Sequence, residues 1–226
     1  MRLPIVAVAV LGCSSPNKPH GHQAHQAPHG HQAPHGEMPH RFEDADRWAQ
    51  VFDDPSRDAW QQPDRVLASL ALTKEMRVAD VGAGTGYFAV RLAPHVAEVV
   101  ATDIEPDMIQ YLGKRAAREG HANLRAVLTP ADDPQLDAAS FDRILVVDVW
   151  HHVPGDRRAF AAKLAAALAP GGVLAVIDYK LDATQGPPPA HRLAPDAILA
   201  DLAAAGLTGH VVLELEHQYV IHARRE

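Results

Sequence analysis

The chain of 226 residues contains one cysteine, Cys13, and only 5% aromatic residues. A single cysteine excludes an internal disulfide and a zinc site built from several thiolates. Lys and Arg number 21 against 28 Asp and Glu, which gives a formal net charge of −7. This balance argues against a nucleic-acid partner, because phosphate binding depends on clustered basic side chains. No apolar stretch approaches the ~20 residues of a membrane-spanning helix.

What remains has the composition of a globular protein, with 47% hydrophobic and 22% charged residues. The length suits one domain with a full core and leaves little room for a second. We expect that domain to occupy residues 41–226, because the composition changes at about residue 41.

The first fifteen residues, MRLPIVAVAVLGCSS, combine one Arg, an apolar run from Leu3 to Leu11 and a small residue before Cys13. They resemble a bacterial lipoprotein signal, with residues 1–12 as the signal segment and Cys13 as the acylated residue. The resemblance implies a lipid anchor on the periplasmic or outer-membrane side. The alternative is a mis-assigned start codon, with Met38 as the true start and a cytoplasmic protein.

Residues 13–40 are predicted to be a disordered, His-rich tether. They offer almost no apolar surface whose burial would offset the entropy of ordering. The imidazole nitrogens of this tract are expected to bind zinc, copper or nickel weakly. A polar linker that drifted into repeats explains it equally well, and no required metal is predicted. The tract holds seven histidines: His20, His22, His25, His29, His31, His35 and His40.

The remainder alternates between predicted strands and helices, which is typical of an α/β protein with a parallel sheet covered on both faces. Residues 41–72 are predicted to form an N-terminal helical cap that is interrupted at Pro55. Residues 210–223 are predicted to form an antiparallel hairpin at one edge of the sheet, because the connection between its two strands is too short for a crossover. The other predicted strands are 76–82, 98–104, 124–128, 141–149 and 173–179. The predicted helices are 85–95, 106–120, 195–207 and one from residue 156 that is stopped by Pro170 and two glycines.

The segment VADVGAGTGYF, residues 78–88, places three glycines directly after a predicted strand. It lacks the Gly-Lys-Ser/Thr ending of a phosphate-binding loop, and its G-x-G-x-G spacing departs from the dinucleotide pattern G-x-G-x-x-G. Asp80 would repel a pyrophosphate but suits a cationic ligand. Asp103, at the end of the next strand, is placed to accept hydrogen bonds from ribose hydroxyls. Asp103 alone would equally indicate NAD, but together with Asp80 it favours S-adenosylmethionine, which is cationic and has no phosphate.

Three further segments, ATDIEPDMI (101–109), SFDRILVVDVWHH (140–152) and LAPGGVLAVID (168–178), complete an ordered series. With this series the chain from residue 41 onward resembles the class I S-adenosylmethionine-dependent methyltransferases. The resemblance implies a Rossmann-like doubly wound sheet of seven strands, mostly parallel, with an antiparallel C-terminal hairpin. It also implies a cofactor bound over the carboxyl ends of the strands.

The resemblance carries binding roles onto particular residues. Asp103 would hold the ribose and Ile104 would pack on the adenine. Pro130 stands where an acidic residue is common, so Asp132 is the candidate for the adenine amino group. Asp148, at the mouth of the same site, is also expected to bind the cofactor. The methionine part would be contacted by Asp80, Gly82, Gly84 and Gly86.

His151 and His152 follow the fourth strand, beside the expected methyl group. A neutral histidine near pH 7 can remove a proton from an attacking hydroxyl or amine, which makes both residues catalytic candidates. Positioning alone supplies about 7–11 kcal/mol to such a displacement, so a base is optional. The alternative is structural, with one histidine capping or packing a helix and the other facing solvent.

Trp48, Trp60, Tyr179 and the loop GPPPAHR (186–192) are expected to cover the cofactor and select the acceptor, or merely to pack on the sheet. The absence of thiols in the domain excludes arsenite methylation, and the scarcity of Lys and Arg near the motifs disfavours a strongly acidic acceptor. A small neutral molecule is therefore expected, with a protein side chain second, and S-adenosylhomocysteine as the co-product. The other class of function is a non-catalytic, membrane-tethered lipoprotein that binds a nucleoside in a methyltransferase-like fold and a metal in its His tract.

Overall fold

The computed structural model describes residues 44–225. Cys13, the His-rich tract and the predicted boundaries at residues 12 and 40 lie outside the described residues. Within them, no helix has both the length and the apolar character required to cross a bilayer.

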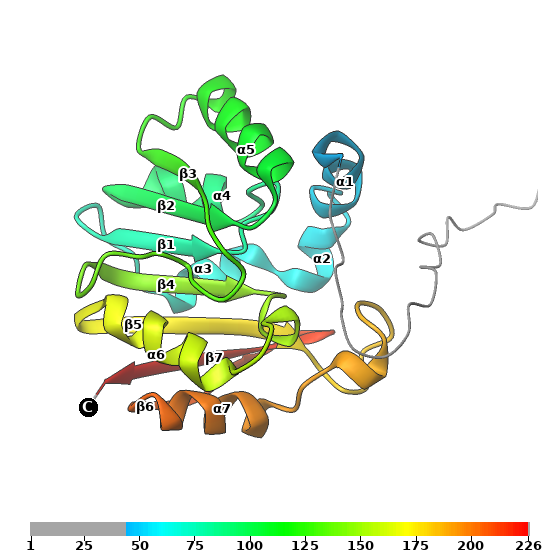
Figure 1. The fold of residues 1–226 in the computed structure, drawn as a ribbon. Helices are drawn as coiled ribbons and strands as arrows, with labels where there is room; N and C mark the ends of the chain where they lie inside the picture. The colour runs from blue at the N-terminus through cyan, green and yellow to red at the C-terminus, as the bar shows by residue number, and fades with distance from the viewer. Residues whose placement is uncertain (1–43, 226) are drawn as a thin grey trace, which may run out of the picture. The chain divides into compact units, whose positions relative to one another are not determined.

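The centre of the described region is one sheet of seven strands in the order β3-β2-β1-β4-β5-β7-β6 (Figure 1). Strands β1 to β5 are mutually parallel where they pair, and β7 runs antiparallel to both β5 and β6. The predicted α/β fold with its antiparallel C-terminal pair is confirmed. The strands are β1 Arg77–Val81, β2 Glu98–Asp103, β3 Leu124–Leu128, β4 Phe141–Val147, β5 Leu168–Tyr179, β6 Leu207–Glu214 and β7 Gln218–Arg225.

Helices cover both faces of the sheet, as the strand–helix alternation predicted. Several begin with proline in the first turn, where its missing N–H costs no hydrogen bond. The described helices are α1 Ala45–Phe52, α2 Arg57–Gln61, α3 Pro63–Ser69, α4 Ala89–Leu92, α5 Pro106–Glu119, α6 Arg157–Ala167 and α7 Pro195–Ala204. Short 3-10 turns are η1 Ala93–His95, η2 Trp150–His152 and η3 Pro189–His191.

Two hydrophobic cores lie on opposite faces of the sheet. In β4, Ile144 and Val146 join the core under α6 and α7, whereas Leu145 and Val147 join the core under α3 and α4. Successive side chains of a strand point to opposite faces, so a strand that is buried on both sides needs an unbroken apolar run. The sequence ILVV, residues 144–147, supplies that run in β4.

Three local predictions were wrong in their boundaries. The helix expected from residue 85 starts at Ala89, because Gly84 and Gly86 have φ of 55° and 91°, outside the right-handed helical region. The helix expected to stop at Pro170 already ends at Ala167, and β5, expected from residue 173, begins at Leu168. Its pairing with β4 shifts register between Phe141 and Arg143. Helix α2, between Pro55 and Pro63, was not predicted.

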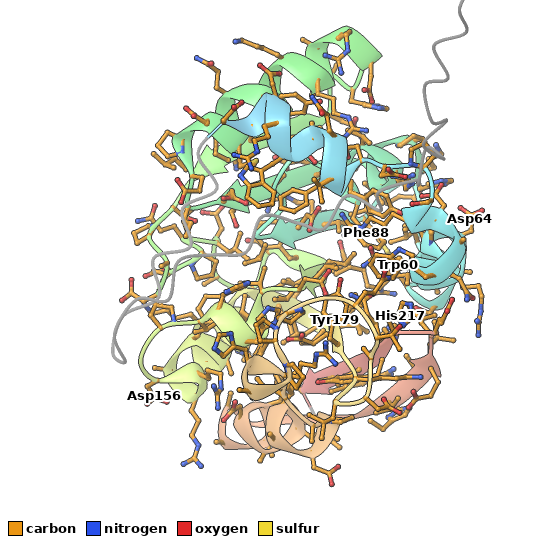
Figure 2. All side chains as sticks on the ribbon, turned by 90° about the vertical axis from the view of Figure 1, so that its right-hand side faces the viewer. Trp60, Asp64, Phe88, Asp156, Tyr179 and His217 are labelled. Atoms are coloured by element: carbon orange, nitrogen blue, oxygen red, sulfur yellow. The ribbon has the colours of Figure 1, made fainter. Side chains whose placement is uncertain are left out.

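The parallel strands β1 to β5 end at a common edge of the sheet. In Figure 1 this carboxyl edge faces right, toward α1 and α2, and Figure 2 looks directly onto it. Ligands of open parallel sheets bind at this edge.

Candidate functional site

The glycine loop, residues 82–86, leaves β1 at the carboxyl edge and is held by backbone hydrogen bonds. The N–H groups of Gly82 and Ala83 donate to the carbonyl oxygen of Thr102 in β2, at 2.8 and 2.9 Å. The N–H of Gly84 donates to Oδ2 of Asp103 at 2.7 Å. The loop is therefore fixed to the end of β2 before any ligand binds.

The three glycines serve different purposes. A Cβ on Gly82 would lie 2.2 Å from Cγ2 of Val149, and one on Gly86 would lie 2.3 Å from Cδ1 of Leu112. These two positions are glycine because the protein itself packs against them, in addition to their positive φ. At Gly84 the nearest atom to such a Cβ is 3.6 Å away, on the ring of Phe52. Gly84 is thus the glycine of the loop that faces helix α1.

Two acidic side chains lie buried beside this loop. Asp80 is 2% exposed, and its Oδ2 has no hydrogen-bond partner among the described residues. Burial, reinforced by the negative charge of Asp103, raises the pKa of Asp80 to about 7. The Oδ1 of Asp103 accepts from the N–H of Glu105 at 3.0 Å, and burial raises the pKa of Asp103 as well. The hydroxyl oxygens of Thr85 and Thr102 are also buried without a described partner.

An apolar surface continues from the acidic pair along the edge. Ile104 follows β2 and is 48% exposed, and Leu128 ends β3 and is 49% exposed. Leu128 pairs in register with Asp103, so the two apolar side chains belong to neighbouring strand ends. Asp132 is exposed in the next loop, and its carbonyl oxygen accepts from Nζ of Lys163 at 2.7 Å.

Asp148 follows β4 with φ of 58°, a left-handed conformation that non-glycine residues seldom adopt outside turns and functional sites. Its Oδ1 accepts a hydrogen bond from Nε2 of Gln218, and its Oδ2 lies 3.8 Å from Nη2 of Arg57. Burial raises the pKa of Asp148 to about 7, although Arg57 opposes this.

His151 lies on η2 and is paired with Asp178 of β5. Its Nδ1 is 2.9 Å from Oδ1 and 3.1 Å from Oδ2 of Asp178. Burial by itself would lower the pKa of His151, but the hydrogen bond and charge of Asp178, together with the charge of Asp148, raise it. His152 is the exposed member of the pair, with its ring centroid 4.1 Å from that of His151.

Helix α2 reaches into the same edge with side chains that the sequence did not single out. Arg57 lies over the ring of Tyr87 at 4.0 Å and donates to the carbonyl oxygen of Phe52 at 2.8 Å. Gln61 is fully buried and donates to Gln218. Neither glutamine belongs to a motif, so no local signal marked them. Asp178 did have a signal, as an acidic residue that closes an apolar strand.

Aromatic rings from three distant segments meet at this edge, as Figure 2 shows for the labelled residues. Trp60 of α2 lies with its ring centroid 6.1 Å from that of Tyr179 and 5.9 Å from that of His217. A Cβ on Gly186 would lie 2.3 Å from Cε1 of Tyr179, so the 186–192 loop begins directly against this ring. The fold thus brings Trp60 together with Tyr179 and that loop. We call Trp60, Tyr179 and His217 the aromatic cluster.

Among residues 44–225, no set of three or more His, Cys, Asp or Glu side chains is arranged to hold a metal ion. The structure thus groups the predicted residues into two adjoining parts. One part comprises the glycine loop with Asp80, Asp103 and Ile104. The other comprises Asp148 with His151 and His152.

Comparison with known proteins finds similarity to methyltransferases. Residues 78–172 match the model of a methyltransferase domain. An uncharacterized methyltransferase of Mycobacterium tuberculosis is 37% identical over 101 residues, covering 45% of this chain and 39% of the relative. The tRNA 5-carboxymethoxyuridine methyltransferase of Escherichia coli is 33% identical over 122 residues, covering 53% of this chain and 46% of that enzyme. The chain thus spans less than half the length of these two relatives.

The fold is shared over a longer stretch with a solved structure. The SAM-dependent methyltransferase from Aquifex aeolicus aligns with a TM-score of 0.72 and 26% identity, covering 80% of this chain and 97% of that one. The seven-stranded order with β7 inserted between β5 and β6 matches the methyltransferase form of the Rossmann-like fold. Residues 78–172 are thus similar in sequence to a methyltransferase domain, and the fold is similar to that of a SAM-dependent methyltransferase.

Proposed function

We propose that this chain transfers the methyl group of S-adenosylmethionine to a small neutral acceptor and releases S-adenosylhomocysteine. The observation that carries the proposal is the buried Oδ2 of Asp80, which has no described partner and lies next to a preformed glycine loop. A buried carboxylate without a partner is costly, and a cationic group of a ligand would satisfy it. Bound there, the cofactor would supply a methyl group already activated on a sulfonium.

The residues along the edge fit the rest of that molecule. Asp103 keeps lone pairs on both oxygens after accepting two backbone hydrogen bonds, so it can also accept from ribose hydroxyls. Ile104 and Leu128 offer an apolar surface for the adenine ring. Asp132, exposed in the following loop, remains the candidate for the adenine amino group.

The residues after β4 and β5 would handle the acceptor. His151 would remove its proton, and Asp148 would help to orient it, with His152 at the outer side. The aromatic cluster of Trp60, Tyr179 and His217 would form an apolar wall that excludes water. The guanidinium of Arg57 donates hydrogen bonds to the carbonyl oxygen of Phe52 and to the side chain of Gln61, so these donors are used within the protein. This supports a neutral rather than an acidic acceptor.

Binding is tested by calorimetry and thermal unfolding with S-adenosylmethionine and with S-adenosylhomocysteine. A ligand at 100 times its dissociation constant should stabilise the folded protein by about 2.7 kcal/mol. Asp103→Ala should abolish this shift, whereas Asp64→Asn, on the exposed side of α3, should retain it. If neither compound changes the melting temperature of the wild-type protein, the proposed function is wrong.

The acceptor is tested by a screen that follows release of S-adenosylhomocysteine. The screen should contain small hydroxyl and amine compounds and, because one relative is named as a tRNA methyltransferase, also unmodified tRNA. Turnover with small molecules alone is expected. Turnover with tRNA alone would show that the prediction against nucleic acid, made from the net charge of −7, is wrong.

A further inference from the structure

We propose that Asp178 is a positioning residue for His151, and that it holds the imidazole in the tautomer whose Nε2 accepts the proton of the methyl acceptor. This inference deepens the proposed function and rests on it. Asp178 was not among the residues that the sequence assigned to the site.

The pair is placed by the topology of the sheet. His151 lies on η2, just beyond the end of β4, and Asp178 lies one residue before the end of β5. Strands β4 and β5 are parallel neighbours, with Val147 opposite Ile177. Their carboxyl ends therefore bring the imidazole and the carboxylate together at the edge where the cofactor is proposed to bind.

The geometry defines which ring nitrogen is free. An ionised carboxylate only accepts hydrogen bonds, so Nδ1 at 2.9 Å from Oδ1 must carry the hydrogen. Neutral His151 then has its lone pair on Nε2. The carboxylate is itself held, because Oδ1 also accepts from the N–H of Tyr179 at 2.7 Å. The side chains of His151 and Asp178 are only 3% and 0% exposed, so water competes little for the bond.

The surrounding charges favour a proton on His151 once it has been transferred. Asp178 faces the ring from β5, Asp148 faces it from the end of β4, and His152 lies beside it on η2 with its ring plane inclined by 43°. Asp148 in turn contacts Arg57 of α2 and Gln218 of β7. The negative charges of Asp178 and Asp148 both favour an imidazolium at His151. The pKa of His151 is raised accordingly.

The O–H or N–H proton of the acceptor passes to Nε2 of His151. The electron pair of the acceptor forms a bond to the methyl carbon, and the carbon–sulfur bond breaks with its electron pair going to sulfur. S-adenosylhomocysteine leaves as a neutral thioether, and the imidazolium returns its proton to water. Asp178 stabilises the imidazolium through its hydrogen bond to Nδ1.

The first test needs no acceptor. Nitrogen-15 NMR of the wild-type protein, above the pKa of His151, should show Nδ1 protonated and Nε2 unprotonated. In Asp178→Asn the pKa of His151 should fall by about one unit or more, because an opposite charge next to the ring is lost. Finding the Nε2–H tautomer in the wild type would overturn the proposal, even if the variant failed to fold.

The second test separates positioning from structure. In Asp178→Asn, kcat should fall about 100-fold, and the acidic limb of its pH profile should move to lower pH. Affinity for S-adenosylmethionine should stay within about threefold, since Asp178 does not contact the proposed cofactor site. The double variant with His151→Gln should be no slower than His151→Gln alone, because Asp178 acts through His151.

The outcomes distinguish the two proposals. If wild-type protein binds no S-adenosylmethionine, the proposed function fails regardless of how His151 titrates. If Asp178→Asn binds S-adenosylmethionine and keeps both kcat and the His151 pKa of the wild type, the role of Asp178 is refuted while the proposed function stands. If the losses of kcat from the two single variants multiply in the double variant, the role of Asp178 is likewise refuted.

Discussion

The side-chain amide of Gln61 donates a hydrogen bond of 2.9 Å to the amide oxygen of Gln218, 157 residues further along the chain. Both side chains are fully buried. Gln218 passes the interaction on by donating to Asp148, and Gln61 accepts from Nε of Arg57. Helix α2 is thus joined through β7 to the end of β4 by a continuous polar chain beneath the surface.

Breaking this chain should destabilise the protein. Gln61→Leu is expected to lower the free energy of unfolding by about 1–3 kcal/mol, because the buried amide oxygen of Gln218 loses its donor. The Gln61→Leu/Gln218→Leu double variant should cost less than the sum of the two single variants, since the partners are in contact. Urea denaturation measures all three. Gln110→Ala on the exposed face of α5 should stay within about 0.5 kcal/mol of wild type, and strict additivity would contradict the contact.

Asp80 should make the stability of the free protein depend on pH. Its pKa is about 7 when folded and near the ordinary value of 3.8 when unfolded, so the folded state alone holds a proton between these values. Stability contributed by this group therefore falls as the pH rises through that window.

Asp80→Asn removes this penalty. We expect the variant to have a larger free energy of unfolding than wild type at pH 8, by on the order of a few kcal/mol, and therefore a higher melting temperature. The difference should shrink toward pH 5. It should also bind S-adenosylmethionine far more weakly. A variant that is less stable than wild type at pH 8 would show that Asp80 is stabilised by a partner in the free protein.

Gly86 should tolerate no side chain. Gly86→Ala would require an alanine at φ of 91° with its Cβ 2.3 Å from Cδ1 of Leu112, a residue that is itself fully buried. A loss of about 2–4 kcal/mol in the free energy of unfolding is expected from strain and overpacking together.

The matched control is Gly113→Ala in α5. No atom lies within 4 Å of the Cβ it would add, and alanine favours a helix over glycine. This substitution should stabilise the protein by about 0.5–1 kcal/mol. Thermal unfolding of Gly86→Ala and Gly113→Ala measures both changes in stability. Similar changes at the two positions would contradict the close packing of Gly86 against Leu112.

Acylation of Cys13 remains a prediction for a part of the chain outside the described residues. In a bacterial host, mass spectrometry of the membrane fraction should find a mature protein that begins with acylated Cys13, and Cys13→Ser should abolish the modification. A protein that starts at Met1 or Met38 and carries no lipid would contradict the predicted signal.

Much of the fold could be read from local patterns. The strands β2 and β3 appear where apolar runs indicated them, and β2, which is buried on both faces, needs such a run whatever surrounds it. The glycine loop and the acidic residues at 80 and 103 were likewise visible, since they belong to one strand–turn–helix–strand unit. Boundaries near Gly86 and Leu168 were missed because left-handed glycines and a register shift depend on neighbouring strands.

What the sequence by itself determined is the order of strands and helices and the chemistry of the turn after β1, because both arise from residues that are close together in the chain. Only the tertiary structure decided that Gln61 meets Gln218, that Asp178 holds His151 and that α2 lies over the carboxyl edge. These contacts join segments separated by up to 157 residues, and their polar side chains carry no periodic signal. The physical reason is burial. A polar group in a buried position must find its partner wherever the fold places one, and the strand order sets that place.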